Sequence, residues 1–126
     1  SMEECRELIA SVDKSNIGVV IDSWHWWTAR ETPDHILALS NSDVVSADLN
    51  DAPKGLERDE QYDNQRELPA TTGVINIKSF LGALLKIGYD GPIRAEPFNQ
   101  TLDEMDDEQA SESTAIAMKK AFALVK

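Results

Sequence analysis

The sequence predicts an α/β domain, and three observations lead to that prediction. Four helix-like and three strand-like segments alternate along the 126 residues. The strand-like segments are short, apolar and rich in β-branched residues, which is typical of parallel strands covered on both faces. With 41% hydrophobic and 28% charged residues and no break in composition, the chain has enough apolar material for one core and shows no second domain.

Two helices and two strands are predicted in the first part of the chain. Residues 3–12 place apolar side chains three and four positions apart, which indicates a helix with one buried face. Residues 17–22 form a β-branched run that is too short for a buried helix and indicates a strand. A second helix is expected over 33–39, because Thr32 can cap it and proline favours the first helical position. Residues 44–49 are again typical of a strand.

The second part begins with a long polar segment, residues 50–73, which predicts a functional loop because structureless loops of this length are uncommon in compact domains. A third helix is expected over 77–87, where apolar residues recur with a helical period. Residues 91–96 predict the third strand, and residues 107–124 the fourth helix, whose first turn is acidic and whose last turns carry lysines. The alternation then implies parallel strands joined by right-handed crossovers.

The charge excludes some classes of partner. Twelve basic against 23 acidic residues leave a net charge of -11, which repels nucleic acid and anionic membrane surfaces. We find neither an apolar run long enough for a bilayer nor a secretion signal, so we expect an intracellular, cytoplasmic protein. Cys5 is the single cysteine, which excludes an internal disulfide and a cysteine-based zinc site. Ser1 and Met2 are typical of an expression scar.

Each predicted strand ends in or near a carboxylate, namely Asp22, Asp48 and Glu96. The carboxyl ends of neighbouring parallel strands line the ligand crevice of such sheets, so the three acids are expected to converge. Like charges at close range need a compensating cation, and a divalent metal is the natural candidate. The alternative is that each acid caps a helix or begins a turn.

Three further residues are candidates for substrate binding. His25 follows Asp22 closely and can bind a metal or a substrate hydroxyl, and the adjacent Trp24 can wall a pocket against water. The alternative for this tryptophan-rich stretch is a place in the core or in a subunit contact. Arg66, in the long loop, can clamp a phosphate or adjacent hydroxyls with its planar fork. An exposed salt bridge is the alternative for Arg66.

Four separated strings, in this order along the chain, resemble the sugar phosphate isomerase/epimerase family, whose members have the xylose isomerase-like TIM-barrel fold. They are Ile21-Asp22-Ser23-Trp24-His25-Trp26; Leu49-Asn50-Asp51-Ala52-Pro53; Arg66-Glu67-Leu68-Pro69 with Gly73-Val74-Ile75; and Gly88-Tyr89-Asp90-Gly91-Pro92 with Glu96-Pro97-Phe98. The match runs from about residue 16 to the C-terminus. A complete barrel needs about 250 residues, so the resemblance implies a partial TIM barrel, with residues 3–126 as its C-terminal part and with barrel strands six, seven and eight.

The resemblance also implies a site. Asp22 and Glu96 match metal ligands of strands six and eight, and Asp48 stands where many relatives have a histidine ligand, so manganese, magnesium, cobalt and zinc all stay open. His25 matches a residue that contacts substrate oxygen, and Glu96 would also be a catalytic acid/base group. The strand-five glutamate of the family has no counterpart here. Ala70 replaces a glycine expected in the loop.

The implied function is isomerisation or epimerisation of a sugar or sugar phosphate by proton transfer through an enediol, assisted by a divalent metal. This part alone is expected to be weakly active or inactive, because a positioned acid is missing. Two alternatives stay open. The chain is a non-catalytic partial barrel that self-associates through open sheet edges or pairs with the missing N-terminal half, or it is part of a related sugar dehydratase with the same ligands.

Overall fold

The computed structural model describes all residues 1–126 and has the predicted α/β architecture. The elements in chain order are α1 (Met2–Val12), β1 (Val19–Asp22), α2 (Ser23–Thr28), α3 (Pro33–Leu37), the 3₁₀ helix η1 (Asn41–Asp43), β2 (Val44–Leu49), the 3₁₀ helix η2 (Arg58–Glu60), α4 (Ile77–Lys86), β3 (Ile93–Ala95), α5 (Gln100–Asp103) and α6 (Asp107–Ala123). The four predicted helices are α1, α3, α4 and α6, and all three predicted strands are present. The short helices α2 and α5 were not predicted, because neither is long enough to show a helical period.

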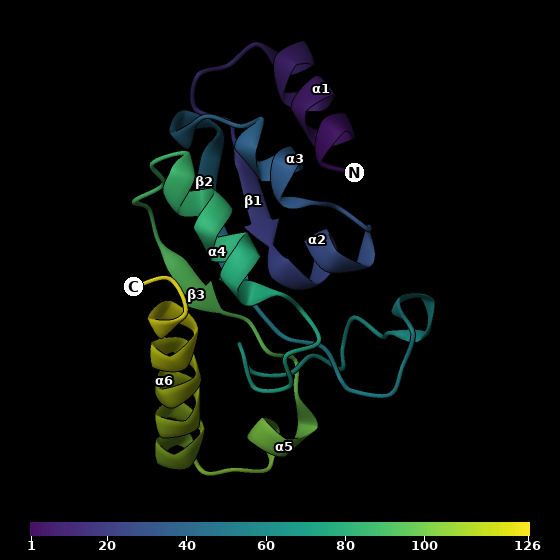
Figure 1. The fold of residues 1–126 in the computed structure, drawn as a ribbon, viewed down its shortest axis with the longest axis vertical. Helices are drawn as coiled ribbons and strands as arrows, with labels where there is room; N and C mark the ends of the chain where they lie inside the picture. Colours follow the sequence, from purple (N-terminus) through teal and green to yellow (C-terminus); the bar gives the residue numbers. More distant parts are fainter.

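The three strands form one parallel sheet in the order β1-β2-β3 (Figure 1). Asp22 of β1 pairs in register with Asp48 of β2, and Asp48 pairs in register with Arg94 of β3. Register partners in a parallel sheet lie on the same face. The sheet therefore brings two of the predicted carboxylates and one arginine into a single row near the carboxyl ends of the strands.

The core lies on one face of the sheet, where α4 crosses in front of the strands and α6 stands beside β3 (Figure 1). The buried apolar residues of this layer come from the strands (Val19, Ile21, Ala47, Leu49), from α3 (Ile36) and from α4 (Ile77, Phe80, Leu81, Leu84). Their spacing in α4 is that of an amphipathic helix, as the sequence indicates. Ala117 and Ala121 of α6 are buried as well, and their small side chains allow close packing of that helix.

The opposite face of the sheet carries the residues that alternate with the buried ones. Val20 and Asp22 lie on this face of β1, and Val20 is 54% exposed. Helix α1, which has no buried residue, stands at one end of the molecule (Figure 1). None of the helices combines the length and the apolar character that a bilayer crossing requires. The candidate site thus opens on the face that the core does not use.

The long loop after β2 is fixed by Asp51, which is fully buried. Its carboxylate accepts hydrogen bonds from four backbone N–H groups, those of Ala52 (2.9 Å), Thr72 (3.0 Å), Gly73 (2.8 Å) and Ile75 (2.9 Å). Asp51 also pairs with Glu67 in an antiparallel bridge. Ala70 has a φ of +56°, a left-handed conformation that favours glycine, which gives a physical reason to expect glycine there. The two ends of the loop are therefore held together by a single buried carboxylate.

Candidate functional site

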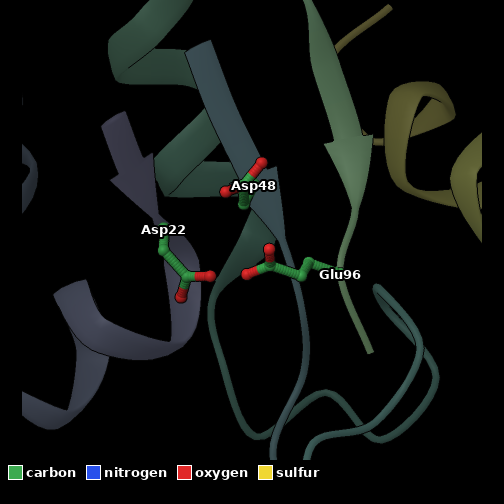
Figure 2. Close-up of side chains that lie close together, drawn as sticks. All are labelled: Asp22, Asp48 and Glu96. Carbon is green, nitrogen blue, oxygen red and sulfur yellow. The ribbon is translucent and has the colours of Figure 1, made fainter. Parts of the chain in front are cut away.

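Asp22, Asp48 and Glu96 converge at the carboxyl ends of the three strands, as the sequence predicts (Figure 2). One carboxylate oxygen from each lies within 4.8 Å of the others. Asp22 ends β1, Asp48 is the penultimate residue of β2, and Glu96 follows β3 directly. In Figure 2 the Glu96 side chain reaches across toward Asp22. The two aspartates are buried and Glu96 is 38% exposed, so Glu96 is the most accessible of the three.

Asp22 is held by four hydrogen bonds. Its Oδ1 caps α2 by accepting from the backbone N–H groups of Trp24 (2.7 Å) and His25 (2.9 Å). Its Oδ2 accepts from Asn50 Nδ2 (2.8 Å) and from Arg66 Nη1 (3.0 Å). A carboxylate offers about four acceptor positions, so all of those of Asp22 are in use. The alternative prediction of a helix cap is thus also correct for Asp22.

Asp48 is held by Arg94, which reaches it along the row set by the register. Arg94 Nε lies 2.6 Å from Asp48 Oδ1 and Nη2 lies 3.1 Å from Oδ2, so the guanidinium contacts the carboxylate at two points. This hydrogen bonding raises the pKa of the Arg94 guanidinium. Arg94 Nη2 is also 3.9 Å from Glu96 Oε1, and the arginine side chain is 61% exposed. Arg94 therefore brings a positive charge to two of the three acids.

Arg66 lies at the centre of the site and is only 2% exposed, so an exposed salt bridge is the wrong alternative for it. Its Nη1 donates to Asp22 Oδ2 (3.0 Å) and to Glu96 Oε2 (3.3 Å). Its Nη2 contacts the Asp63 carboxylate and His25 Nε2 (3.1 Å), and its Nε donates to the Asp63 carbonyl (3.0 Å). The hydrogen bond from Arg66 lowers the pKa of the Asp63 carboxyl. All five N–H donors of the guanidinium thus have partners.

Two aromatic rings pack against Arg66. The guanidinium carbon lies 5.1 Å from the Trp24 ring centroid and 5.0 Å from that of Phe98, within the range of cation–π attraction. Trp24 also meets His25 edge to face at 5.2 Å, and it is buried. Trp26 is buried in the core against Phe80. Trp24 therefore lines the site beside Arg66 and His25, whereas Trp26 fulfils the core alternative.

The three acids offer a donor set that suits a hard divalent cation, because all three ligand atoms are carboxylate oxygens. A metal is not the only counter-charge for the three acids in this structure. Two guanidinium groups, those of Arg66 and Arg94, already contact the three carboxylates. The site thus combines oxygen ligands for a cation with two arginines that partly neutralise them.

Sequence reasoning missed four residues that shape the site. Arg94 and Asn50 could have been predicted from the spacing of the sequence. Arg94 lies two positions before Glu96 and Asn50 two positions after Asp48, and residues two positions apart in an extended strand point to the same face. Asp63 and Phe98 gave no such signal, because they reach Arg66 from irregular segments. His35, the second histidine of the chain, lies outside the site: it is exposed and contacts Glu31 and the backbone N–H of Thr32.

Comparison with known proteins places this geometry in a family. The family model described as "Xylose isomerase-like TIM barrel" matches residues 1–121. Two curated relatives are an inosose isomerase from Halalkalibacterium halodurans, 27% identical over a 133-residue alignment that covers 94% of this chain and 43% of the relative, and a 3-dehydroshikimate dehydratase from Pseudomonas aeruginosa, 28% identical over 98 residues that cover 77% of this chain and 15% of the relative.

Solved structures share the fold. A xylose isomerase domain protein from Alicyclobacillus acidocaldarius superposes with a TM-score of 0.82 at 29% identity, over 98% of this chain and 43% of that one. The IolI protein, solved with a bound zinc atom, superposes with a TM-score of 0.86 at 20% identity, over 94% of this chain and 42% of that one. The chain therefore spans less than half the length of these relatives, which matches a partial barrel of three strands.

Proposed function

The chain belongs to the xylose isomerase-like TIM barrel family, and from this membership we propose that it is the C-terminal part of a divalent-metal-dependent isomerase or epimerase of a sugar or sugar phosphate. The observation that carries the proposal is the convergence of Asp22, Asp48 and Glu96 within 4.8 Å at the open face of the sheet. The inosose isomerase among the relatives supports the reaction class. The zinc atom of the IolI structure supports the cofactor class.

The residues of this chain divide the work in the proposed mechanism. Asp22, Asp48 and Glu96 would hold the metal. When bound, it would polarise adjacent carbonyl and hydroxyl oxygens of the sugar and so acidify the C–H bond of the hydroxyl-bearing carbon next to the carbonyl. Glu96, the most exposed of the three, moves a proton to or from the substrate as an enediol forms and collapses. Its proton-transfer partner would come from the part of the barrel that lies outside this chain.

Binding and orientation of the substrate fall to residues beside the acids. The exposed imidazole of His25 is placed to hydrogen-bond a substrate hydroxyl, and Trp24 behind it limits the access of water. The fork of Arg66 is the candidate for a phosphate or for two adjacent hydroxyls once some of its donors, all of which have partners in this structure, are released. His25 contacts Arg66, and the Arg66 guanidinium packs against Trp24, so the three side chains form one cluster beside the acids.

Substitution of Glu96 by glutamine tests the proposed reaction. In the protein that contains this chain within a complete barrel, we expect E96Q to lower the turnover of a ketose, aldose or inosose by about 10² to 10⁴, because a general acid/base group is lost. The measurement is interconversion of the sugars followed by chromatography. E104Q removes an exposed glutamate outside the site and should leave turnover unchanged. Equal turnover of E96Q and the unsubstituted protein would overturn the proposal.

A dehydratase is the second candidate reaction, and the 3-dehydroshikimate dehydratase among the relatives favours it. Both reactions begin with removal of a proton next to a carbonyl, so they use the same acids. The products separate the two, since an isomerase conserves the mass of its substrate and a dehydratase releases water. Mass spectrometry of the products formed by the unsubstituted protein distinguishes them.

We also propose that this chain self-associates when it is the only part of the barrel present. Three strands cannot close a barrel, so the edge of β1 keeps unpaired backbone groups. A cavity of about 560 Å³ runs along that edge, lined by Val20 and by Met2 and Cys5 of α1. Light scattering is expected to give a mass above the 14.0 kDa of one chain. A monodisperse monomer at high concentration would contradict this expectation.

A further inference from the structure

We propose that Arg66 is an internal counter-ion which a divalent metal must displace, and that this displacement frees the guanidinium to bind substrate. The inference rests on the proposed function, because it concerns the same metal. It adds an order of events: the cation binds first, and the substrate then meets an arginine with free donors. Three observations on Arg66 support it.

The first observation is the position of Nη1. This nitrogen lies between Asp22 Oδ2 (3.0 Å) and Glu96 Oε2 (3.3 Å) and donates to both. A divalent ion bound to the same two oxygens would lie about 2.0 to 2.6 Å from each, and would use the lone pairs that Nη1 now occupies. The ion and the Nη1 group therefore compete for one position between the two acids.

The second observation is the saturation of Asp22. Its four acceptor positions are taken by two backbone N–H groups, by Asn50 and by Arg66. The backbone donors belong to the first turn of α2 and cannot leave without breaking that helix. Asn50 and Arg66 are the two side-chain donors to Asp22, and of these two only Arg66 also contacts Glu96, so its release frees both acids for the cation. Displacement of Arg66 is therefore the least costly way to open Asp22 to a metal.

The third observation is what still holds Arg66 after displacement. Its Nε and Nη2 contact the backbone carbonyl and the carboxylate of Asp63, and Nη2 also contacts His25. Trp24 and Phe98 lie against the guanidinium at 5.1 and 5.0 Å. These contacts do not involve the metal position. Because the guanidinium is rigid, displacement of Nη1 means that the whole group turns about its Asp63 contacts, and Arg66 would then stay in the site with its two Nη1 hydrogens free, beside the imidazole that is proposed to contact substrate oxygen.

Competition between the metal and Arg66 predicts how removal of Arg66 changes the affinity for the metal. If the metal must break the Nη1 contacts in order to bind, then removal of Arg66 removes that cost and strengthens metal binding. Coupling between sites in proteins is commonly about 5-fold to 150-fold. We therefore expect R66M, which keeps an unbranched side chain without the charge, to bind zinc at least about tenfold more tightly than the unsubstituted chain.

Calorimetric titration of the whole chain with zinc chloride measures this change. R30M is the matched control, because Arg30 is paired with a single carboxylate, that of Asp59, is 61% exposed and lies outside the cluster. We expect R30M to bind zinc as the unsubstituted chain does. Equal affinity of R66M and the unsubstituted chain would overturn the exchange while leaving the metal site of the proposed function intact. Absence of zinc binding by both at millimolar concentration would overturn the exchange and the metal site together.

A second measurement does not depend on the folding of R66M. The chain contains five arginines, so a nitrogen-15 spectrum of its arginine side chains is simple to follow. On addition of zinc chloride to the unsubstituted chain, we expect the Arg66 Nε signal to shift and that of Arg30 to stay in place. Zinc binding with no change at Arg66 would show that metal and guanidinium occupy the site together, which contradicts displacement.

Discussion

Substitution of Asp51 by alanine is expected to lower the free energy of unfolding by about 4 kcal/mol. The carboxylate is fully buried and accepts from the backbone N–H groups of residues 52, 72, 73 and 75. Alanine leaves these donors without a partner, and the loss is most costly for the N–H groups of Ala52 and Ile75, whose hydrogen bonds are buried. Because a domain of this size is stable by only about 5 to 15 kcal/mol, we expect the loop over 50–73 to loosen and the whole chain to approach its stability limit.

Urea denaturation followed by circular dichroism measures the effect of D51A. The stability of D51N is expected to fall between those of D51A and the unsubstituted chain, with a loss of about 2 kcal/mol in the free energy of unfolding. The asparagine amide retains one accepting oxygen but turns an NH₂ group toward other donors. The matched control is D59A, which removes an exposed aspartate of the same loop and should change stability by less than about 1 kcal/mol. Equal stability of D51A and D59A would show that the loop does not depend on the buried carboxylate.

Substitution of Asp22 by alanine is expected to cost about 3 to 4 kcal/mol of stability before any metal is considered. The substitution removes the cap of α2 and leaves the buried Arg66 with one carboxylate fewer. A buried charge that loses its partner is strongly destabilising, whereas a helix cap alone is worth about 1 kcal/mol. Chemical denaturation of D22A without metal measures the sum of the two effects.

A double-mutant cycle separates the charge from the cap. In D22A/R66M both members of the pair are gone, so we expect the double variant to be more stable than the sum of the single losses predicts, by about 1 to 3 kcal/mol. R30M combined with D22A is the control, because Arg30 contacts Asp59 and not Asp22, and its effect should simply add. Additive losses in D22A/R66M would show that the pair contributes no coupling energy.

The positions of the three acids follow from local patterns, which explains why the sequence predicts them. Short β-branched runs identify the strands, and parallel pairing then brings the carboxyl ends to one edge, so the convergence of Asp22, Asp48 and Glu96 needs no knowledge of side-chain packing. β2 has the predicted bounds, while β1 and β3 are shorter than predicted. Proline at position 92 has no N–H to donate to a ladder, which is one reason why β3 begins later.

The burial of Arg66 could not be derived in the same way. Its place depends on how a loop of more than twenty residues folds back, and that path is set by the buried carboxylate of Asp51 and by contacts with Asp63 and Phe98. None of these contacts has a fixed spacing in the sequence. Arg94 is a different case, since its position two residues before Glu96 is enough to place it on the same face of β3.

The open face of the sheet has a consequence for the strength of the charges on it. Glu96 is 38% exposed, so solvent of high permittivity weakens its attraction to Arg66 across their 3.3 Å contact. If another protein surface covered this face, the effective permittivity would fall below the value of about 20 that is typical of pairs near a protein surface, and the same attraction would become stronger. Enclosure alone would therefore tighten the charge network, without a change in any residue of this chain.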